Sequence, residues 1–348
     1  MQKIYMDSMG KLKSEMDKAG NSGFIAYAKV VTLAVMNMRY EKIAFNKGLN
    51  DHPYVLTKEL IEDALTMFNA MCDVSFIESG KTAKKLKSRD KEEKHRLLFN
   101  EIWDKYNSEE FEGYVDRYVY RINVNNLADV IKDKSCVDLG CGNGVFCFAL
   151  LKCGARYAAG IDFGDDSIQY AKAVANEKNL DERTHFVTSS VYITPYEDNS
   201  FDFAIQNGVF HHLKDYEQAI METRRILKPG GWFWYYTDGE GGISYDLWDT
   251  SVEILRDVPS DFVEDILESM NVSRNKIVHL TDGLNATYAH TSWDKITSVL
   301  SRHGFGDFKR LTGGFDTDFD LDKIQADPYG KDKFGEGDLR ILCRLMEK

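Results

Sequence analysis

The stretch Cys136–Phe146, CVDLGCGNGVF, decides the fold of this chain. A short apolar run ends in Asp138, and Gly140, Gly142 and Gly144 lead from it into a second apolar segment. Glycines let a backbone turn tightly and approach a ligand closely, and the following helix would offer free N–H groups at its N-terminus. The stretch therefore predicts a strand, a ligand-binding loop and a helix, although a loop of this kind can also be a simple turn.

From Ser135 onward, short apolar runs alternate with helical patterns. Alternation of this kind is typical of βαβ units and a parallel sheet. We therefore expect a doubly wound α/β fold. The expected strands lie at residues 135–138, 158–162, 185–188, 201–206 and 232–236.

Two acidic residues indicate the ligand of the loop. Asp162 closes the second expected strand, where a carboxylate can accept two hydrogen bonds from a ribose diol. The dinucleotide fingerprint requires a glycine where this chain has Val145, which weakens the case for NAD. Asp138 would repel a pyrophosphate and attract an ammonium group. S-adenosylmethionine carries both a ribose and an ammonium group, so it is the favoured ligand.

Four motifs in order resemble those of the class I S-adenosylmethionine-dependent methyltransferases, over residues 131–236. This resemblance implies a Rossmann-like seven-stranded sheet, parallel apart from an antiparallel edge hairpin that residues 308–311 and 339–345 could supply. It also implies S-adenosyl-L-homocysteine as the product. The motifs are VDLGCGNG at 137–144, GIDFGDDSI at 160–168, YEDNSFDFAIQNGVFHHL at 196–213 and LKPGG at 227–231.

The resemblance also implies a cofactor site, with one departure from the family pattern. Many members have Gly-Asp-Ala after the third strand, whereas this chain has Ser189, Ser190 and Val191. Ser190 can still accept one hydrogen bond from adenine. The residues expected to bind the cofactor are Asp138, Gly140, Gly142, Asn143, Asp162, Phe163, Ser190, Val191 and Asn207.

Methyl transfer is an in-line displacement that requires a positioned nucleophile and, for some acceptors, a base. His211 and His212 follow the fourth expected strand at the edge where such sheets bind ligands, and histidine titrates near neutral pH. Asp238 follows the fifth strand, and His290 lies in a polar segment after it. These four residues are our candidates for catalysis, with packing as the alternative role of the histidines.

The chain outside the motifs predicts two further parts. Residues 1–125 show apolar positions at helical spacing, and we expect a helical region that serves as a lid, an acceptor pocket or a homodimer contact. Residues 126–348 form the expected methyltransferase domain, with an inserted helical cap at 243–290. The aromatic side chains of residues 103–120 would either line a cavity or pack between the parts.

Composition limits the partners. The net charge of −12 opposes binding to nucleic acid or anionic membranes. The sequence shows neither a membrane span nor a secretion leader, and its six cysteines suggest reduced thiols, so we expect a cytoplasmic protein. The four aspartates of residues 315–322 do not match a calcium loop, and no metal is expected.

These observations favour a methyltransferase with a small-molecule acceptor. The Asn/Asp-Pro-Pro-aromatic tetrapeptide of nucleic-acid amino methyltransferases is replaced here by Gln206, Asn207, Gly208 and Val209. Nitrogen, oxygen, carbon and sulfur acceptor atoms all remain open. One alternative is a catalytically inactive subunit that binds S-adenosylmethionine and acts by association with another protein. An NAD-dependent enzyme is the other alternative.

Overall fold

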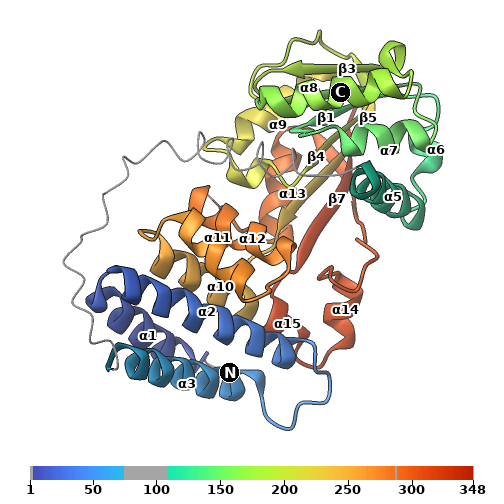
Figure 1. The fold of residues 1–348 in the computed structure, drawn as a ribbon. Helices are drawn as coiled ribbons and strands as arrows, with labels where there is room; N and C mark the ends of the chain where they lie inside the picture. The colour runs from blue at the N-terminus through green and yellow to red at the C-terminus, as the bar shows by residue number, and fades with distance from the viewer. Residues whose placement is uncertain (1–2, 74–107, 287, 348) are drawn as a thin grey trace. The chain divides into compact units, whose positions relative to one another are not determined.

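The computed structural model describes residues 3–73, 108–286 and 288–347. Contacts divide the chain into two compact units, and each is assembled from three separate stretches of sequence (Figure 1). The helical unit takes residues 1–90, 240–286 and 322–335, and the sheet unit takes residues 91–239, 287–321 and 336–348. The expected boundary at residue 125 stays a prediction, but the contacts group the chain differently from that simple division.

A seven-stranded sheet forms the centre of the sheet unit, in the order β3-β2-β1-β4-β5-β7-β6. The first five strands are parallel, and β7 runs antiparallel to both of its neighbours. This confirms the expected fold class and its antiparallel edge hairpin. The strands are β1 (Ser135–Leu139), β2 (Tyr157–Asp162), β3 (Thr184–Thr188), β4 (Phe201–Asn207), β5 (Leu227–Asp238), β6 (Phe305–Arg310) and β7 (Asp338–Leu345).

Strand β5 begins earlier than the sequence predicted. Residues 227–231, which precede the expected strand at 232–236, belong to the strand because Leu227 already pairs with Phe201. The register then shifts between Phe201 and Phe203, and regular pairing resumes at Trp232. An irregularity in the ladder therefore absorbs the proline and the glycines of this segment.

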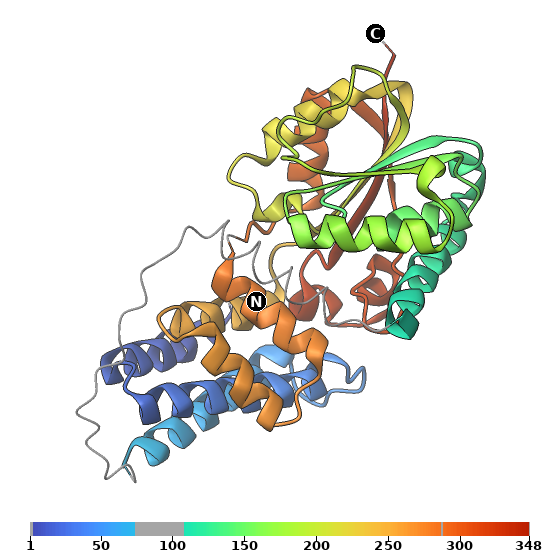
Figure 2. The same cartoon turned by 45° about the horizontal axis from the view of Figure 1, so that its top comes forward.

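Helices cover both faces of the sheet. One face carries α5 (Ser108–Val124), α7 (Val145–Lys152) and α8 (Asp165–Glu177), and the other carries α9 (Tyr216–Ile226) and α13 (Trp293–Arg302) (Figure 2). A short helix, α6 (Ala128–Ile131), precedes β1. The strand order reverses between β1 and β4, so the carboxyl ends of these two strands flank the crevice where doubly wound sheets bind ligands.

The helical unit combines the N-terminal helices with the insertion after β5. Helix α10 packs against α1 and α2, and α11 packs against α2. Because these helices bury their apolar faces on one another, the insertion and the N-terminal region belong to one core. The helices are α1 (Met6–Ala19), α2 (Gly23–Ala44), α3 (Pro53–Asp73), α10 (Gly242–Leu255), α11 (Ser260–Ser269), α12 (Arg274–Asn285), α14 (Leu321–Ala326) and α15 (Gly330–Phe334).

Part of the expected aromatic segment, with Trp103 and Tyr106, lies outside the described residues. Among the helices that are described, none combines the length and the apolar character needed to cross a membrane. All six cysteines lie in the described ranges, and none of them forms a disulfide.

Candidate functional site

The loop between β1 and α7 has the tight backbone that its glycines predicted. Gly140, Gly142 and Gly144 have φ angles of 87°, 51° and 83°, all in the left-handed region. A Cβ at Gly140 would lie 2.5 Å from the Val209 side chain, and one at Gly144 would lie 2.8 Å from the Phe186 ring. Gly140 and Gly144 are therefore also required for packing, because a side chain at either position would collide with a neighbouring side chain.

Asp162 braces this loop from the end of β2. Its Oδ2 accepts a hydrogen bond from the Gly142 N–H at 2.8 Å, and its Oδ1 accepts one from the Gly164 N–H at 2.8 Å. A carboxylate has about four lone-pair sites and can accept several hydrogen bonds at once. The ribose contact stays a prediction, and the structure adds a second role in holding the loop.

Asp138 is a buried carboxyl group at the end of β1. Its side chain is 3% exposed, and its Oδ1 has no hydrogen-bond partner among the described residues. Burial, and secondarily the negative charge of Asp162, raise the pKa of Asp138 to about 8. A nearby cation would stabilise the ionised carboxylate and lower this pKa. The site is therefore suited to a positively charged ligand group.

Two buried amides beside Asp138 are also incompletely bonded. The Nδ2 of Asn143, whose side chain is 1% exposed, and the Oδ1 of Asn207 find no partner in the described part of the chain. Leaving a buried polar atom unpaired costs about 1–3 kcal/mol, so such atoms usually indicate a ligand or ordered water. One donor and two acceptors thus flank the crevice between β1 and β4, a set that is complementary to an amino-acid carboxylate and ammonium group.

Helix α5 holds one of these amides in place. The Tyr118 ring stacks on Phe146, with 4.3 Å between the ring centroids and 11° between the planes. Its hydroxyl accepts a hydrogen bond of 3.1 Å from Asn207 Nδ2. The sequence placed Tyr118 in an aromatic segment without a specific role, and no local signal could have paired it with a residue 89 positions away.

The contacts of the residues expected near adenine do not indicate a ligand. Phe163 is 42% exposed and Val191 is 8% exposed. The Ser190 hydroxyl oxygen accepts a hydrogen bond of 3.2 Å from the Tyr192 N–H and so supports its own turn. The adenine roles of Phe163, Ser190 and Val191 stay predictions.

The four candidate catalytic residues gather around Tyr288. Its ring centroid lies 4.6 Å from that of His211, 4.7 Å from His212 and 5.3 Å from His290. Its hydroxyl donates a hydrogen bond of 2.5 Å to Asp238 Oδ2. His211, His212 and Asp238 are all buried, so the cluster is largely shielded from water. Such shielding strengthens electrostatic interactions and suits proton transfer to or from a bound acceptor.

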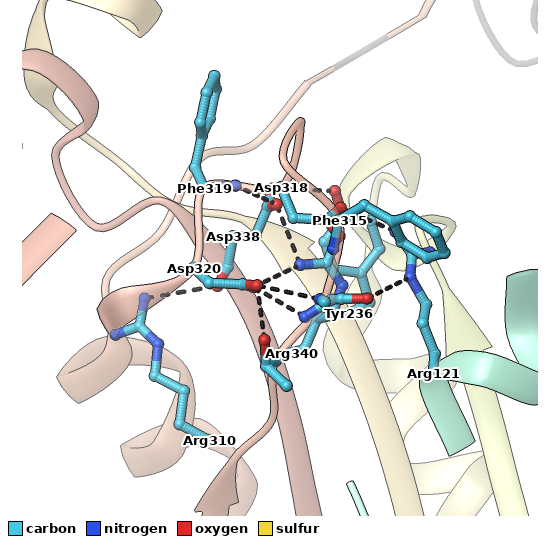
Figure 3. A network of polar contacts seen from close by, with 12 residues as sticks. Arg121, Tyr236, Arg310, Phe315, Asp318, Phe319, Asp320, Asp338 and Arg340 are labelled. Carbon is cyan, nitrogen blue, oxygen red and sulfur yellow. Dashed lines mark hydrogen bonds and ion pairs between the residues drawn. The ribbon is translucent and has the colours of Figure 1, made fainter. Parts of the chain in front are cut away.

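A polar network continues from Asp238 to the beginning of β7. The Tyr236 hydroxyl lies 3.0 Å from Asp238 Oδ1 and 3.3 Å from Asp338 Oδ1, and Arg340 binds Asp338 at 3.0 Å (Figure 3). Arg340 also binds Asp318 at 2.9 Å and Asp320 at 3.2 Å. Two of the four aspartates of residues 315–322 therefore pair with a buried arginine.

Asp320 shows how hydrogen bonds and a neighbouring cation stabilise an ionised carboxylate in this network. Burial opposes its ionisation, but hydrogen bonds from Thr312, Gly313 and Gly314, together with the charge of Arg340, bring the pKa of Asp320 below its ordinary value. Asp318 also belongs to this network, because Arg121 of α5 binds it at 2.8 Å (Figure 3). The network thus ties the 311–320 loop to α5 and β7.

Part of the sheet unit is similar to known proteins. Residues 137–235 match the family model described as a methyltransferase domain. A demethylmenaquinone methyltransferase of Staphylococcus aureus is 32% identical over 147 residues, which are 41% of this chain and 58% of that protein. A norajmaline N-methyltransferase of Rauvolfia serpentina is 29% identical over 99 residues, 28% of this chain and 34% of that protein. The chain thus spans less than two thirds of the length of these relatives.

A solved structure is similar over more of the chain. The 1,6-didemethyltoxoflavin-N1-methyltransferase of Burkholderia thailandensis, solved with 1,6-didemethyltoxoflavin and S-adenosylhomocysteine, is 15% identical with a TM-score of 0.44. The match covers 78% of this chain and 98% of that one.

Proposed function

Because the sheet unit contains a class I S-adenosylmethionine-dependent methyltransferase domain, we propose that the chain transfers a methyl group from S-adenosylmethionine to a small-molecule acceptor. One observation carries the proposal. Asp138 Oδ1, Asn143 Nδ2 and Asn207 Oδ1 are buried polar atoms without partners among the described residues, and they flank the crevice at the strand-order reversal.

The residues of this crevice fit the amino-acid end of the cofactor. Asp138 and Asn207 would accept from its ammonium group, and the Asn143 amide would donate to its carboxylate. Asp162, which braces Gly142, would accept hydrogen bonds from the ribose hydroxyls. When bound, the cofactor supplies an electrophilic methyl group, so the protein's own contribution is to orient it and to exclude water.

The acceptor side of the proposal rests on the cluster around Tyr288. His211 and His212 are buried imidazoles, and histidine is the side chain that most often acts as a general base. Asp238 holds the Tyr288 phenol, and the phenol ring in turn packs on both imidazoles. Such packing restricts the imidazole orientations, which a general base needs. The acceptor atom stays open among nitrogen, oxygen, carbon and sulfur.

The dinucleotide alternative fits this crevice less well. A pyrophosphate carries no ammonium group to pair with the buried Asp138 carboxyl group, whose ionisation Asp162 already opposes. Calorimetric titration with S-adenosylmethionine, S-adenosylhomocysteine and NAD separates the two ligands. We expect binding of the first two, and tight binding of NAD alone would contradict the proposal.

Transfer of a labelled methyl group separates the enzyme from an inactive binding subunit. The protein is incubated with methyl-labelled S-adenosylmethionine and a metabolite extract, and labelled products are separated by chromatography. We expect a labelled small molecule that is absent with Asp138→Leu. Asp129→Leu, a change to another aspartate that lies on α6, is the matched control. A protein that binds the cofactor but never labels a product would be the inactive subunit.

The remaining expectations stay proposals with less support. Residues 1–125 would act as a lid, as an acceptor pocket or as a homodimer contact. A cytoplasmic location is supported by the six cysteines, none of which forms a disulfide.

A further inference from the structure

The Tyr118 hydroxyl is the partner of one end of the Asn207 carboxamide. Asn207 Nδ2 donates a hydrogen bond of 3.1 Å to the Tyr118 oxygen. Asn207 Oδ1, at the other end of the same group, is buried and has no partner within the described ranges. A carboxamide donates from its nitrogen and accepts at its oxygen, so its two ends need opposite partners. Because Tyr118 holds the nitrogen, the oxygen is left to accept from a donor in the crevice between β1 and β4.

Packing fixes the Tyr118 ring against the helix that follows the glycine loop. The ring stacks on Phe146 of α7, and Phe146 in turn meets Trp234 of β5 edge to face, with 5.6 Å between the ring centroids. The Arg121 guanidinium lies 5.7 Å from the centroid of the Tyr118 ring, and Asp318 holds Arg121 in place. A closely packed ring of this kind has little freedom to move. Its hydroxyl is therefore a fixed point beside the crevice.

The Tyr118 hydroxyl also lies within electrostatic reach of Asp138. Burial raises the pKa of Tyr118, the charge of Arg121 lowers it, and the charge of Asp138 raises it. The phenol is thus uncharged near neutral pH, and it acts through its hydrogen bond to the Asn207 amide rather than through charge. Toward an ammonium group the two partners differ, because Asp138 pairs with its charge and Asn207 Oδ1 accepts one of its hydrogen bonds.

We propose that Tyr118 is a positioning residue that selects ligands with an ammonium group, because its hydroxyl keeps the Asn207 oxygen turned toward that group. When an ammonium group binds at Oδ1, Nδ2 must have an acceptor in a buried site, and the Tyr118 oxygen is that acceptor. A site preorganised in this way binds its ligand without first reorienting the amide. The proposal rests on the proposed function, which assigns Asn207 to the ammonium group of the cofactor.

Tyr118→Phe tests this role, because phenylalanine keeps the ring that stacks on Phe146 and removes only the hydroxyl. Calorimetry measures the dissociation constants of S-adenosylhomocysteine and of its analogue in which hydrogen replaces the amino group. In the variant, the free amide can turn to other partners and must turn back when the ammonium group binds. We expect affinity for S-adenosylhomocysteine to fall by about tenfold, and affinity for the analogue to stay unchanged.

A comparison of the two ligands separates positioning from a general structural effect. Equal weakening of both would show that the Tyr118 hydroxyl only supports packing, and unchanged binding of both would show that the site does not need it. Either result would overturn the proposal. Tyr120→Phe is the matched control, because it removes a hydroxyl of the same helix that lies 3.5 Å from the Gly314 carbonyl oxygen. We expect the control to bind both ligands as the wild-type protein does, and the same selective loss in the control would also contradict the proposal.

A double variant tests whether Tyr118 acts through Asn207. The ratio of the two dissociation constants is measured for Asn207→Ala and for the protein that carries both Asn207→Ala and Tyr118→Phe. Without the amide, loss of the hydroxyl should not change this ratio further, because the two residues act as one unit. A further loss of selectivity in the double variant would mean that Tyr118 contacts the ammonium group directly, and would overturn its positioning role.

The wild-type protein distinguishes failure of this proposal from failure of the proposed function. If it binds neither S-adenosylmethionine nor S-adenosylhomocysteine, the proposed function fails, and the role of Tyr118 fails with it. If it binds S-adenosylhomocysteine and the analogue equally, recognition of the ammonium group is overturned. If it prefers S-adenosylhomocysteine and Tyr118→Phe keeps that preference, only the role of Tyr118 is wrong.

Discussion

The Tyr288 hydroxyl donates a hydrogen bond of 2.5 Å to Oδ2 of Asp238, a residue 50 positions earlier in the chain. Hydrogen bonds to carboxylates are short and strong. The second oxygen of Asp238 lies 3.0 Å from the Tyr236 hydroxyl, so the carboxylate is held on both sides. Asp238 thereby fixes the phenol against which His211 and His212 pack.

Tyr288→Phe should lower turnover while cofactor affinity is unchanged. The variant keeps the ring but loses the hydrogen bond to Asp238, so the imidazoles lose their fixed neighbour. We expect kcat to fall by about tenfold, with the dissociation constant of S-adenosylhomocysteine unaltered. Tyr196→Phe is the control, because it removes a phenol that pairs with His185, outside the cluster. Equal kcat values for the two variants would contradict this role of Tyr288.

Cofactor binding should release a proton from Asp138. Without a nearby cation its pKa is about 8, so the group is largely protonated at pH 7, and an ammonium group would drive it to the charged form. Calorimetry near pH 7 in two buffers with different ionisation enthalpies should show release of close to one proton. Asp138→Asn should abolish this release, and a wild-type protein that releases none would contradict the assignment.

The same group predicts how stability changes with pH. Its folded pKa of about 8 lies above the unfolded value, which is about 3.9. The folded state therefore binds the proton more tightly, and this contribution is complete below about pH 4 and lost as the pH rises toward 8. Urea unfolding across this range should show a smaller decline in Asp138→Asn than in the wild-type protein without cofactor.

Asp162→Ala should weaken cofactor binding and loosen the loop. We expect a loss of about 100-fold or more in affinity for S-adenosylhomocysteine, because two charge-assisted hydrogen bonds to ribose would be lost. The Gly142 and Gly164 amides would also lose their acceptor. Asp165→Ala is the control, since this nearby carboxylate binds the Thr188 hydroxyl instead. Unchanged affinity in Asp162→Ala would rule out the ribose contact.

Arg340→Met should destabilise the sheet unit. The change would leave Asp318, Asp320 and Asp338 buried without their shared cation. Removing one partner of a buried ion pair typically costs about 3–5 kcal/mol. Arg344→Met, at an exposed position on the same strand, should cost much less. Unfolding in urea measures both variants, and similar values for the two would show that the buried network contributes little to stability.

The sequence determined most of the sheet unit, because its signals are local. Strands buried on both faces give short apolar runs, and helices packed on one face give a periodic pattern. The loop at Gly140–Gly144 was predictable for the same reason, since the left-handed backbone favours glycine. The positions of Asp138 and Asp162 were predictable because each lies near the end of a short apolar run that forms a strand. Because these two strands are parallel neighbours, both carboxyl groups lie toward the same edge of the sheet.

Only the tertiary structure decided which distant side chains meet. The pairing of Asn207 with Tyr118 and of Asp238 with Tyr288 depends on how α5 and the segment after α12 pack on the sheet. No periodicity encodes a contact between residues 50 or 89 positions apart. The three separate stretches of each unit were hidden for the same reason, because helices bury apolar faces against whichever partner the completed chain provides.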